Sequence, residues 1–127
     1  MSALILDAGA FVAVEREDRA MMARLAVARR HAVDLRTSAI VLGEVWRDAR
    51  GRQARLARFL RGVDVRSVDE QMGRAAGVLL GHAGTSNPID ATVALVAENG
   101  DRILTSDPSD IRRLVTAAGT RAVTIGC

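Results

Sequence analysis

Lysine is absent from this 127-residue sequence, and all eighteen basic residues are arginine. The absence excludes functions that depend on a lysine amine, namely P-loop nucleotide binding, Schiff-base chemistry and protein-kinase phosphotransfer in their usual forms. Cysteine occurs once, as Cys127, so neither an intrachain disulfide nor a cysteine metal cluster can form. The chemistry of this chain must therefore rest on other side chains.

Aromatic residues and long apolar runs are also scarce. Aromatics make up 2% of the chain and tyrosine is missing, so stacking on nucleic-acid bases is not a strong theme. No apolar run approaches the ~20 residues of a membrane span. The opening MSALILDA lacks the basic start and long apolar centre of a secretory signal. We therefore expect a cytoplasmic protein that does not bind a membrane.

The composition is that of an ordinary globular domain. Apolar residues make up 49% of the chain, which is enough for a hydrophobic core, and we expect one domain over residues 1–127. The net charge is +3 and the isoelectric point is about 10.8. This charge permits an anionic partner but is weak evidence for one.

The two prolines lie in similar tetrapeptides, NPID (residues 87–90) and DPSD (residues 107–110). Each tetrapeptide is typical of a helix start, with an N-cap residue followed by proline at the first helical position. The last residue of each, Asp90 or Asp110, then faces the positive end of the helix dipole. Capping explains both patterns locally, and it does not prevent these acids from meeting others in space.

Apolar periodicity predicts strands that alternate with helices. The expected strands are residues 3–6, 35–37, 63–67, 102–106 and 122–125. The expected helices are residues 8–14, 20–31, a helix that starts after Ser38 as N-cap and continues toward Gly51, and residues 52–61, 69–84, 88–98 and 108–118. This alternation indicates an α/β fold with a mostly parallel central sheet of four to five strands flanked by helices.

Two acids follow predicted strands. Asp7 ends the first strand, and Asp107 comes directly after residues 102–106. In open α/β sheets the functional crevice lies beyond the carboxyl ends of the strands, so the two carboxylates share that edge if their strands are neighbours. Taken alone, each is equally well explained as a turn or cap residue.

Two further acids lie in apolar helical segments. On a helical wheel with about 100° per residue, Glu44 falls between Ile40 and Val41, inside an apolar arc that includes Trp46. A position at the edge of that face is the competing interpretation. Asp90 begins IDATVALVA, which is apolar almost all round and predicts a buried helix. Because a buried charge must be paired or bound to metal, Asp90 is expected to point into a crevice.

These residues resemble the PIN-domain family and, within it, the VapC-like ribonuclease toxins of bacterial toxin–antitoxin pairs. The likeness runs through LILDAGAFVA, SAIVLGEVWRD, PIDATVALVA and RILTSDPSDI. It implies a PIN-like nuclease domain over residues 1–127, in which Thr105 matches the hydroxyl residue of the family. Asp110 matches an Asp of many members, but Ile111 replaces the aromatic residue that follows it. The acidic quartet of the family corresponds to Asp7, Glu44, Asp90 and Asp107.

Clustered carboxylates without histidine or cysteine suit a hard cation such as Mg²⁺ or Mn²⁺. Such an ion activates water and stabilises the leaving oxygen when a phosphodiester is hydrolysed. We expect Asp7, Asp90 and Asp107 to be ligands, directly or through water. Glu44 is then a ligand or orients the attacking water. The hydroxyl groups of Thr105 and Ser106 are expected to hold a metal-bound water or a phosphate.

The resemblance also implies an RNA substrate, products with 5′-phosphate and 3′-hydroxyl ends, a cognate antitoxin and a homodimer. Arginines are dense between residues 47 and 61 and suit phosphate contacts near the site. A solvated helix face explains the same density. The candidates for RNA contact are Arg47, Arg50, Arg52 and Arg55.

Two other classes were weighed against this interpretation. A phosphoacceptor receiver domain also carries acids at strand ends, but it relies on a lysine that this chain lacks. A non-catalytic PIN-like module that binds RNA or protein stays open. Binding of a divalent metal would separate that module from a nuclease.

Overall fold

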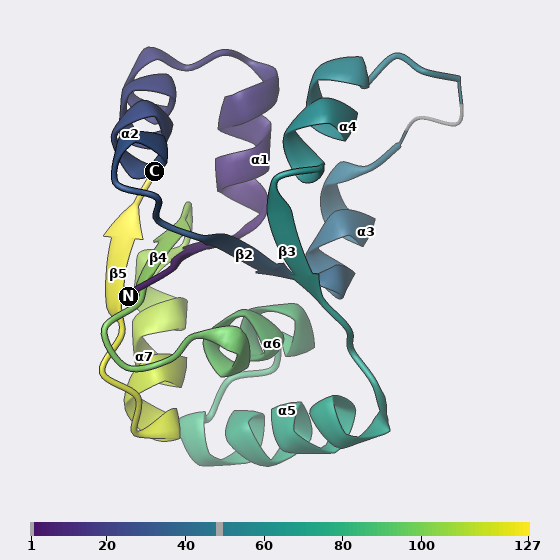
Figure 1. Cartoon of the computed structure of the whole chain (residues 1–127). Coiled ribbons are helices and arrows are strands. Elements are labelled where there is room, and N and C mark those ends of the chain that lie inside the picture. Colours follow the sequence, from purple (N-terminus) through teal and green to yellow (C-terminus); the bar gives the residue numbers. More distant parts are fainter. Residues whose placement is uncertain (1, 48–49) are drawn as a thin grey trace.

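A computed structural model describes residues 2–47 and 50–127, in which five strands form one parallel sheet (Figure 1). The strand order is β3-β2-β1-β4-β5, and β1 pairs with β2 on one side and with β4 on the other. The predicted strands and the mostly parallel sheet are confirmed. The bounds are β1 (Leu4–Leu6), β2 (Leu35–Ser38), β3 (Val63–Arg66), β4 (Arg102–Thr105) and β5 (Val123–Gly126).

The central strand β1 is apolar because both of its faces are covered. All three residues of β1 are buried, as is typical of a parallel strand between two helical layers.

Among the described residues, no helix is both long and apolar enough to cross a membrane. The helices are α1 (Ala8–Glu15), α2 (Arg19–Arg30), α3 (Leu42–Val45), α4 (Ala54–Leu60), α5 (Glu70–Ala83), α6 (Pro88–Val96) and α7 (Pro108–Ala118), with a 3₁₀ turn η1 (Ala39–Val41) before α3.

The order of the strands fixes where the helices pack. The chain passes from β1 to β2 through α1 and α2, and it returns past β1 from β3 to β4 through α5 and α6. Because such crossovers are right-handed, the two directions place their helices on opposite faces of the sheet. Helix α1 packs on β1 and β4, whereas α6 packs on β1 and β2 from the other side (Figure 1). The direction reverses between β1 and β4, which is where crevices form in such sheets.

The predicted helix around Glu44 is much shorter than expected. It consists of η1 and α3, it ends at Val45, and Trp46 has an extended backbone with φ −84° and ψ 125°. The side chain of Gln53 replaces the next helical hydrogen bonds, because it donates to the Val45 carbonyl at 2.9 Å and accepts from the Arg47 amide at 2.9 Å. Residues 48–49 of the expected helix lie outside the described residues.

This shorter helix corrects the prediction that Glu44 lies inside an apolar face. A 3₁₀ turn has about three residues per turn, so the α-helical wheel does not apply, and Glu44 is exposed and not inside an apolar face. Ile40 and Trp46 of the supposed apolar arc are 42% and 39% exposed. Ser38 precedes η1, but its side chain makes no capping hydrogen bond. Ser38 therefore occupies the predicted N-cap position with an extended backbone, but without a side-chain cap.

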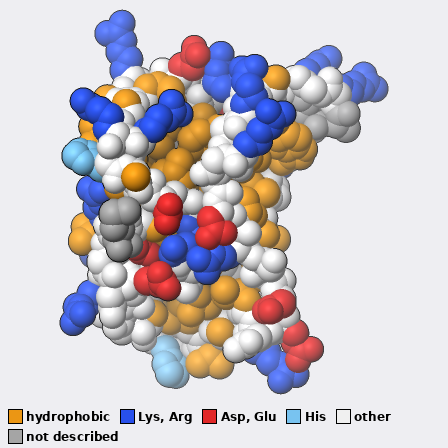
Figure 2. All heavy atoms as spheres, viewed as in Figure 1, with side chains coloured by type: hydrophobic (Ala, Val, Ile, Leu, Met, Phe, Trp, Pro, Cys, Tyr) orange, Lys and Arg blue, Asp and Glu red, His pale blue; other side chains and the backbone are white. Residues whose placement is uncertain are grey.

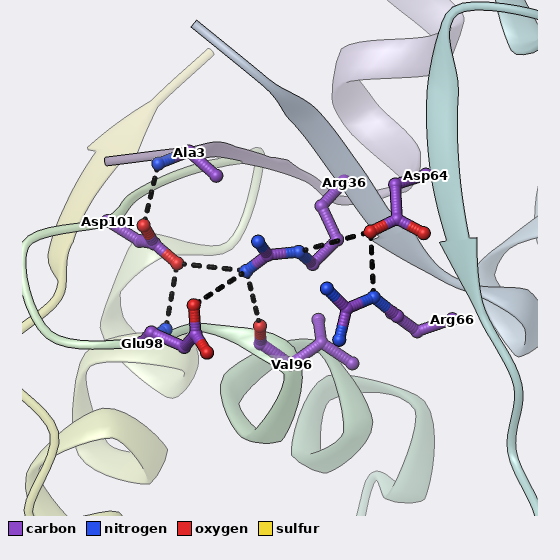
Figure 3. Close-up of polar contacts among 7 residues, drawn as sticks. All are labelled: Ala3, Arg36, Asp64, Arg66, Val96, Glu98 and Asp101. Atoms are coloured by element: carbon purple, nitrogen blue, oxygen red, sulfur yellow. Dashed lines mark hydrogen bonds and ion pairs between the residues drawn. The ribbon is translucent and has the colours of Figure 1, made fainter. Parts of the chain in front are cut away.

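A buried arginine network ties the amino-terminal ends of β1 and β4 to β2 (Figure 3). Nη1 of Arg36, in β2, donates to the Val96 carbonyl at 3.0 Å and pairs with Oδ2 of Asp101 at 3.1 Å. Asp101 is also buried and accepts from the amides of Ala3 at 2.7 Å and Glu98 at 2.8 Å. The segments that this network joins precede β1 and β4, so it lies away from the carboxyl ends of those strands.

Candidate active site

Asp7 lies at the carboxyl end of β1 with both carboxylate oxygens engaged. Oδ1 accepts from the Ala8 amide at 2.8 Å and so caps α1, while Oδ2 accepts from the Thr105 hydroxyl at 2.6 Å. The Thr105 hydroxyl in turn accepts from the Asp107 amide at 3.0 Å. Because β1 and β4 are neighbours, Asp7 and Asp107 share one edge of the sheet, as predicted. Asp7 is 5% exposed and Thr105 is fully buried.

The two Pro-containing tetrapeptides begin α6 and α7 as predicted, but they are not equivalent. Asn87 caps α6 through its side chain, which accepts from the amides of Ile89 at 2.9 Å and Asp90 at 3.2 Å. Asp107 occupies the N-cap position of α7, but its side chain makes no capping bond, and its ψ of 67° departs from the usual extended cap. Asp107 is thus the N-cap residue as predicted, without a full side-chain capping bond, although the Asp110 amide is near enough to act against the rise of the Asp107 pKa.

The Asp107 carboxylate meets two others. One oxygen from each of Asp90, Asp107 and Asp110 lies within 4.8 Å of the others, so α6 and α7 bring three acids together at their first turns. Asp110, which the resemblance offered as a possible supporting residue, is a member of this group. Desolvation, followed by the nearby charge of Asp110, raises the pKa of Asp107.

Asp90 is the most perturbed acid of the site. Its side chain is 7% exposed, and its pKa rises to about 7. Burial is the largest cause, and the negative charges of four neighbouring acids add to it. The prediction that Asp90 points into a crevice is consistent with this burial. The four acids are Asp7, Asp107, Glu44 and Asp110.

Glu44 stands at the rim of the same site. Partial burial and then the charge of Asp7 raise its pKa, so this carboxylate is within electrostatic reach of Asp7 although it belongs to α3. The structure thus brings all four predicted acids, together with Asp110, into one electrostatically coupled site. Glu44 does not belong to the group of three whose oxygens lie within 4.8 Å.

The donor atoms of Asp90, Asp107 and Asp110 fit a hard divalent cation. The ligands are carboxylate oxygens only, which Mg²⁺ and Mn²⁺ prefer over zinc or copper sites rich in histidine and cysteine. Two oxygens on opposite sides of Mg²⁺ stand about 4.2 Å apart, close to the 4.8 Å limit that encloses these three. These three carboxylates would hold part of the coordination shell of such an ion and leave its other positions to water or substrate oxygens.

Gly9 is a site residue that sequence reasoning missed. A Cβ atom at Gly9 would lie 2.8 Å from both Cβ and Oγ of Ser106, so the start of α1 packs directly against the loop between β4 and α7. The glycine in AGAF was the available signal, because glycine inside a helix usually has a packing reason. Ser106 itself is exposed beside Thr105 and Asp107.

The four arginines predicted to contact RNA differ in their contacts. Nη1 of Arg47 donates to the carbonyls of Gly43 and Trp46 at 2.9 Å each. Arg55 pairs with Glu17 at 3.1 Å, beyond the end of α1 that is distant from Asp7. RNA contact by these arginines stays a prediction, as it does for the two exposed residues Arg50 and Arg52.

A separate groove lies between α2 and α4, with a volume of about 730 Å³. Apolar side chains such as Val14, Leu25 and Phe59 line it, and Arg29 and Arg58 stand among its other lining residues. Figure 2 shows hydrophobic side chains lying between arginine side chains in the region of α2 and α4. Its lining is therefore suited to an amphipathic partner with acidic groups.

Comparison with known proteins gives a fold but no sequence relative. No family model matches the sequence, and no curated protein matches it. A chain in the crystal structure of VapBC2 from Rickettsia felis, bound to a DNA fragment from their promoter, is similar over 98% of both chains with a TM-score of 0.70. Its sequence identity of 16% shows the fold alone. This chain therefore shares the α/β fold of that chain.

Proposed function

We propose that this protein is a divalent-metal-dependent endoribonuclease and the toxin of a VapBC-type toxin–antitoxin pair. The observation that carries the proposal is the convergence of Asp90, Asp107 and Asp110 beside the buried Asp7 at the switch point of the sheet. So many carboxylates at one crevice repel one another unless a cation is bound. A cation held at such an edge also attracts the phosphate oxygens of a substrate.

Each acid has a role that follows from its contacts. Asp90, Asp107 and Asp110 would hold Mg²⁺ or Mn²⁺, and Asp7 would contribute through lone pairs that its two hydrogen bonds leave available. When bound, the ion would polarise the scissile phosphate and lower the pKa of water at the site. Glu44, exposed at the rim with a raised pKa, would orient the attacking water and take its proton.

Supporting residues fix these acids in place. Thr105 orients Asp7 and holds the Asp107 amide, so it positions two acids from two elements. Ser106, exposed at the same edge, would contact a phosphate oxygen. RNA as the substrate, with 5′-phosphate and 3′-hydroxyl products, is proposed from the resemblance and supported by the shared fold.

An antitoxin partner is proposed on similar grounds. The solved chain of similar fold belongs to a VapBC2 complex with promoter DNA, which supports a partner of this kind. The groove between α2 and α4 favours protein binding, and it also suits the second candidate function, a non-catalytic module that binds RNA or protein. A homodimer and a cytoplasmic location are proposed from the sequence.

The test is cleavage of end-labelled RNA by purified protein with Mn²⁺, with EDTA, and with DNA of the same sequence. We expect cleavage of RNA with Mn²⁺ only, leaving 5′-phosphate and 3′-hydroxyl ends. Asp90→Asn and Asp107→Asn should each lower the rate about 100-fold or more. Glu70→Gln, an acid-to-amide change in an exposed ion pair of α5, should keep the rate. Cleavage that persists in EDTA would exclude this mechanism, and metal binding without cleavage would favour the binding module.

A further inference from the structure

A second hollow adjoins the acidic site on the side of α1 and α2. We call it the α1–α2 hollow; its lining includes Gly9, Arg16, Arg24, Ser106 and Cys127, and its volume is about 610 Å³. That volume falls in the range of about 300–1,000 Å³ that is typical of small-ligand pockets. The hollow is distinct from the groove between α2 and α4, with which it shares no lining residue.

The α1–α2 hollow is continuous in the chain with the acidic site. Two of its lining residues, Ala8 and Gly9, directly follow Asp7, and Ser106 lies between Thr105 and Asp107. The Cys127 amide donates to the Thr105 carbonyl at 2.9 Å, so the end of β5 is tied to the same edge. Burial raises the pKa of the Cys127 thiol, the charge of Asp7 adds to this effect and Arg24 opposes it, which places Asp7 and Arg24 around one thiol.

The charge in this hollow is of the opposite sign to that of the acidic site. Arg16 and Arg24 are both exposed, and neither forms an ion pair with any residue that the structure describes. Asp18 is the carboxylate that also lines the hollow, and one of its oxygens accepts from the Met21 amide to cap α2. Two available guanidinium groups thus face one partly satisfied acid.

The walls of the α1–α2 hollow are formed largely by small and apolar side chains. Several lining residues are small, among them Ala8, Gly9, Ala13 and Gly126, while Val12 and Met21 supply apolar surface. Helix α1 has eight residues and runs for about 12 Å from the capping Asp7 to the neighbourhood of Arg16. An RNA strand that leaves the acidic site along α1 would first contact these small and apolar side chains. At the far end of the helix it would contact a guanidinium group.

We propose that the α1–α2 hollow holds the nucleotide adjacent to the scissile bond, and that Arg16 and Arg24 bind the phosphate that flanks it. The inference rests on the proposed ribonuclease function. It adds the path that the RNA strand takes away from the acidic site. The acidic site repels a polyanion except at its cation, so a neighbouring cationic hollow compensates by holding the next phosphate. Arginine suits this role because its planar fork matches phosphate oxygens.

The test compares Arg16→Ala, Arg24→Ala and the double variant with Arg30→Ala, an exposed arginine of α2 outside the hollow. Binding of a fluorescent RNA oligonucleotide is measured by anisotropy in an Asp107→Asn background, over a range of salt concentrations. We expect the double variant to bind about tenfold or more weakly and to lose about one unit of salt slope for each phosphate contact removed. Arg24→Lys should keep the salt slope but lose part of the affinity, because lysine keeps the charge without the planar fork, and Arg30→Ala should match the parent.

Two further readouts separate binding from chemistry. In cleavage assays with the native acids, the double arginine variant should raise KM with kcat nearly unchanged, because the flanking phosphate is bound equally in the ground and transition states. RNA should also slow alkylation of Cys127, the single cysteine of the chain, in the parent and not in the double variant.

The outcomes distinguish the two proposals. If wild-type protein cleaves RNA with Mn²⁺ but the double variant binds RNA as the Arg30→Ala control does, the hollow does not hold the strand and this inference is overturned. The same conclusion follows if RNA leaves the alkylation rate of Cys127 unchanged. If the wild type neither binds nor cleaves RNA, the ribonuclease proposal itself fails.

Discussion

The hydroxyl group of Thr105 donates to Oδ2 of Asp7 at 2.6 Å, which couples the carboxyl ends of two neighbouring strands. The same hydroxyl accepts from the Asp107 amide, so one buried side chain sets the positions of a carboxylate on β1 and of the loop that leads to α7. Asp7 also caps α1. The acid cluster is therefore held by the hydrogen bonds of the fold itself.

Thr105→Val keeps the shape of the side chain and removes the hydroxyl. A buried carboxylate and a backbone amide then lose a partner, and we expect a loss of about 1–3 kcal/mol in the free energy of unfolding, with a clear drop in cleavage rate. Thr105→Ser keeps the hydroxyl group and should retain both the stability and the cleavage rate. The control is Thr116→Val in α7, whose exposed hydroxyl donates to the Arg112 carbonyl. Chemical denaturation and initial rates measure the effects; equal losses for Thr105→Val and Thr116→Val would contradict the coupling.

Gly9→Ala should disturb the site although alanine favours helices. The new Cβ would approach Ser106 to 2.8 Å, so α1 or the loop between β4 and α7 must shift. We expect lower thermal stability and weaker Mn²⁺ binding, with partial recovery in the double variant Gly9→Ala/Ser106→Gly. Gly77→Ala in α5 is the matched control, because nothing lies within 4 Å of its added Cβ. That control should gain roughly 0.5–1 kcal/mol in stability; a similar gain for Gly9→Ala would refute the close contact.

The raised pKa of Asp90 predicts a pH dependence of stability in the metal-free protein. The ordinary pKa of an aspartate is about 3.8 and the pKa of Asp90 in the folded state is about 7, so the folded state retains a proton that the unfolded chain releases between these values. Stability in EDTA should therefore fall as pH rises through this window. Asp90→Asn removes the largest part of the effect. Thermal melts of both proteins between about pH 5 and pH 7 measure it, and parallel pH profiles would contradict the assignment.

The network around Arg36 should matter for stability and not for chemistry. Asp101→Ala leaves the buried Arg36 guanidinium without its closest acid and two amides without an acceptor, and we expect a loss of about 3–5 kcal/mol. Glu98→Gln is the control: its side chain is 75% exposed, its pair with Arg36 is 3.7 Å long, and such exposed pairs contribute about 1 kcal/mol or less. Urea denaturation of both variants measures the free energy of unfolding. A small loss of this free energy for Asp101→Ala would show that the network contributes little.

Local sequence patterns predicted most of the fold. The apolar run at β1 and the Asn-Pro and Asp-Pro starts of α6 and α7 each depend on neighbouring residues, and the structure confirms these elements. The alternation of strands and helices indicated a parallel sheet, but it left open whether the strands that precede Asp7 and Asp107 are neighbours, as the structure has them. What was missed depends on distant residues: Gln53 ends α3, and Asp101 pairs with Arg36 from 65 positions away.

The site was predictable in its membership more than in its geometry. The resemblance and the spacing identified the acids that the structure brings together, but neither indicated that Asp110 lies within 4.8 Å of Asp90 and Asp107. That closeness depends on how the first turns of α6 and α7 face each other. The wheel for Glu44 failed because it assumed a continuous α-helix, whereas the backbone forms a 3₁₀ turn and leaves the helix at Trp46.

The shared cation is the central claim, and a thermal melt with and without Mn²⁺ tests it most directly. At a hundredfold excess over its dissociation constant, one bound ion should add about 2.7 kcal/mol to the wild type, a shift on the order of 10 °C. Asp107→Asn should lose most of this shift without unfolding, because its exposed side chain makes no capping bond, while Glu70→Gln should keep the full shift. Equal shifts in wild type and Asp107→Asn would contradict a metal site at these carboxylates.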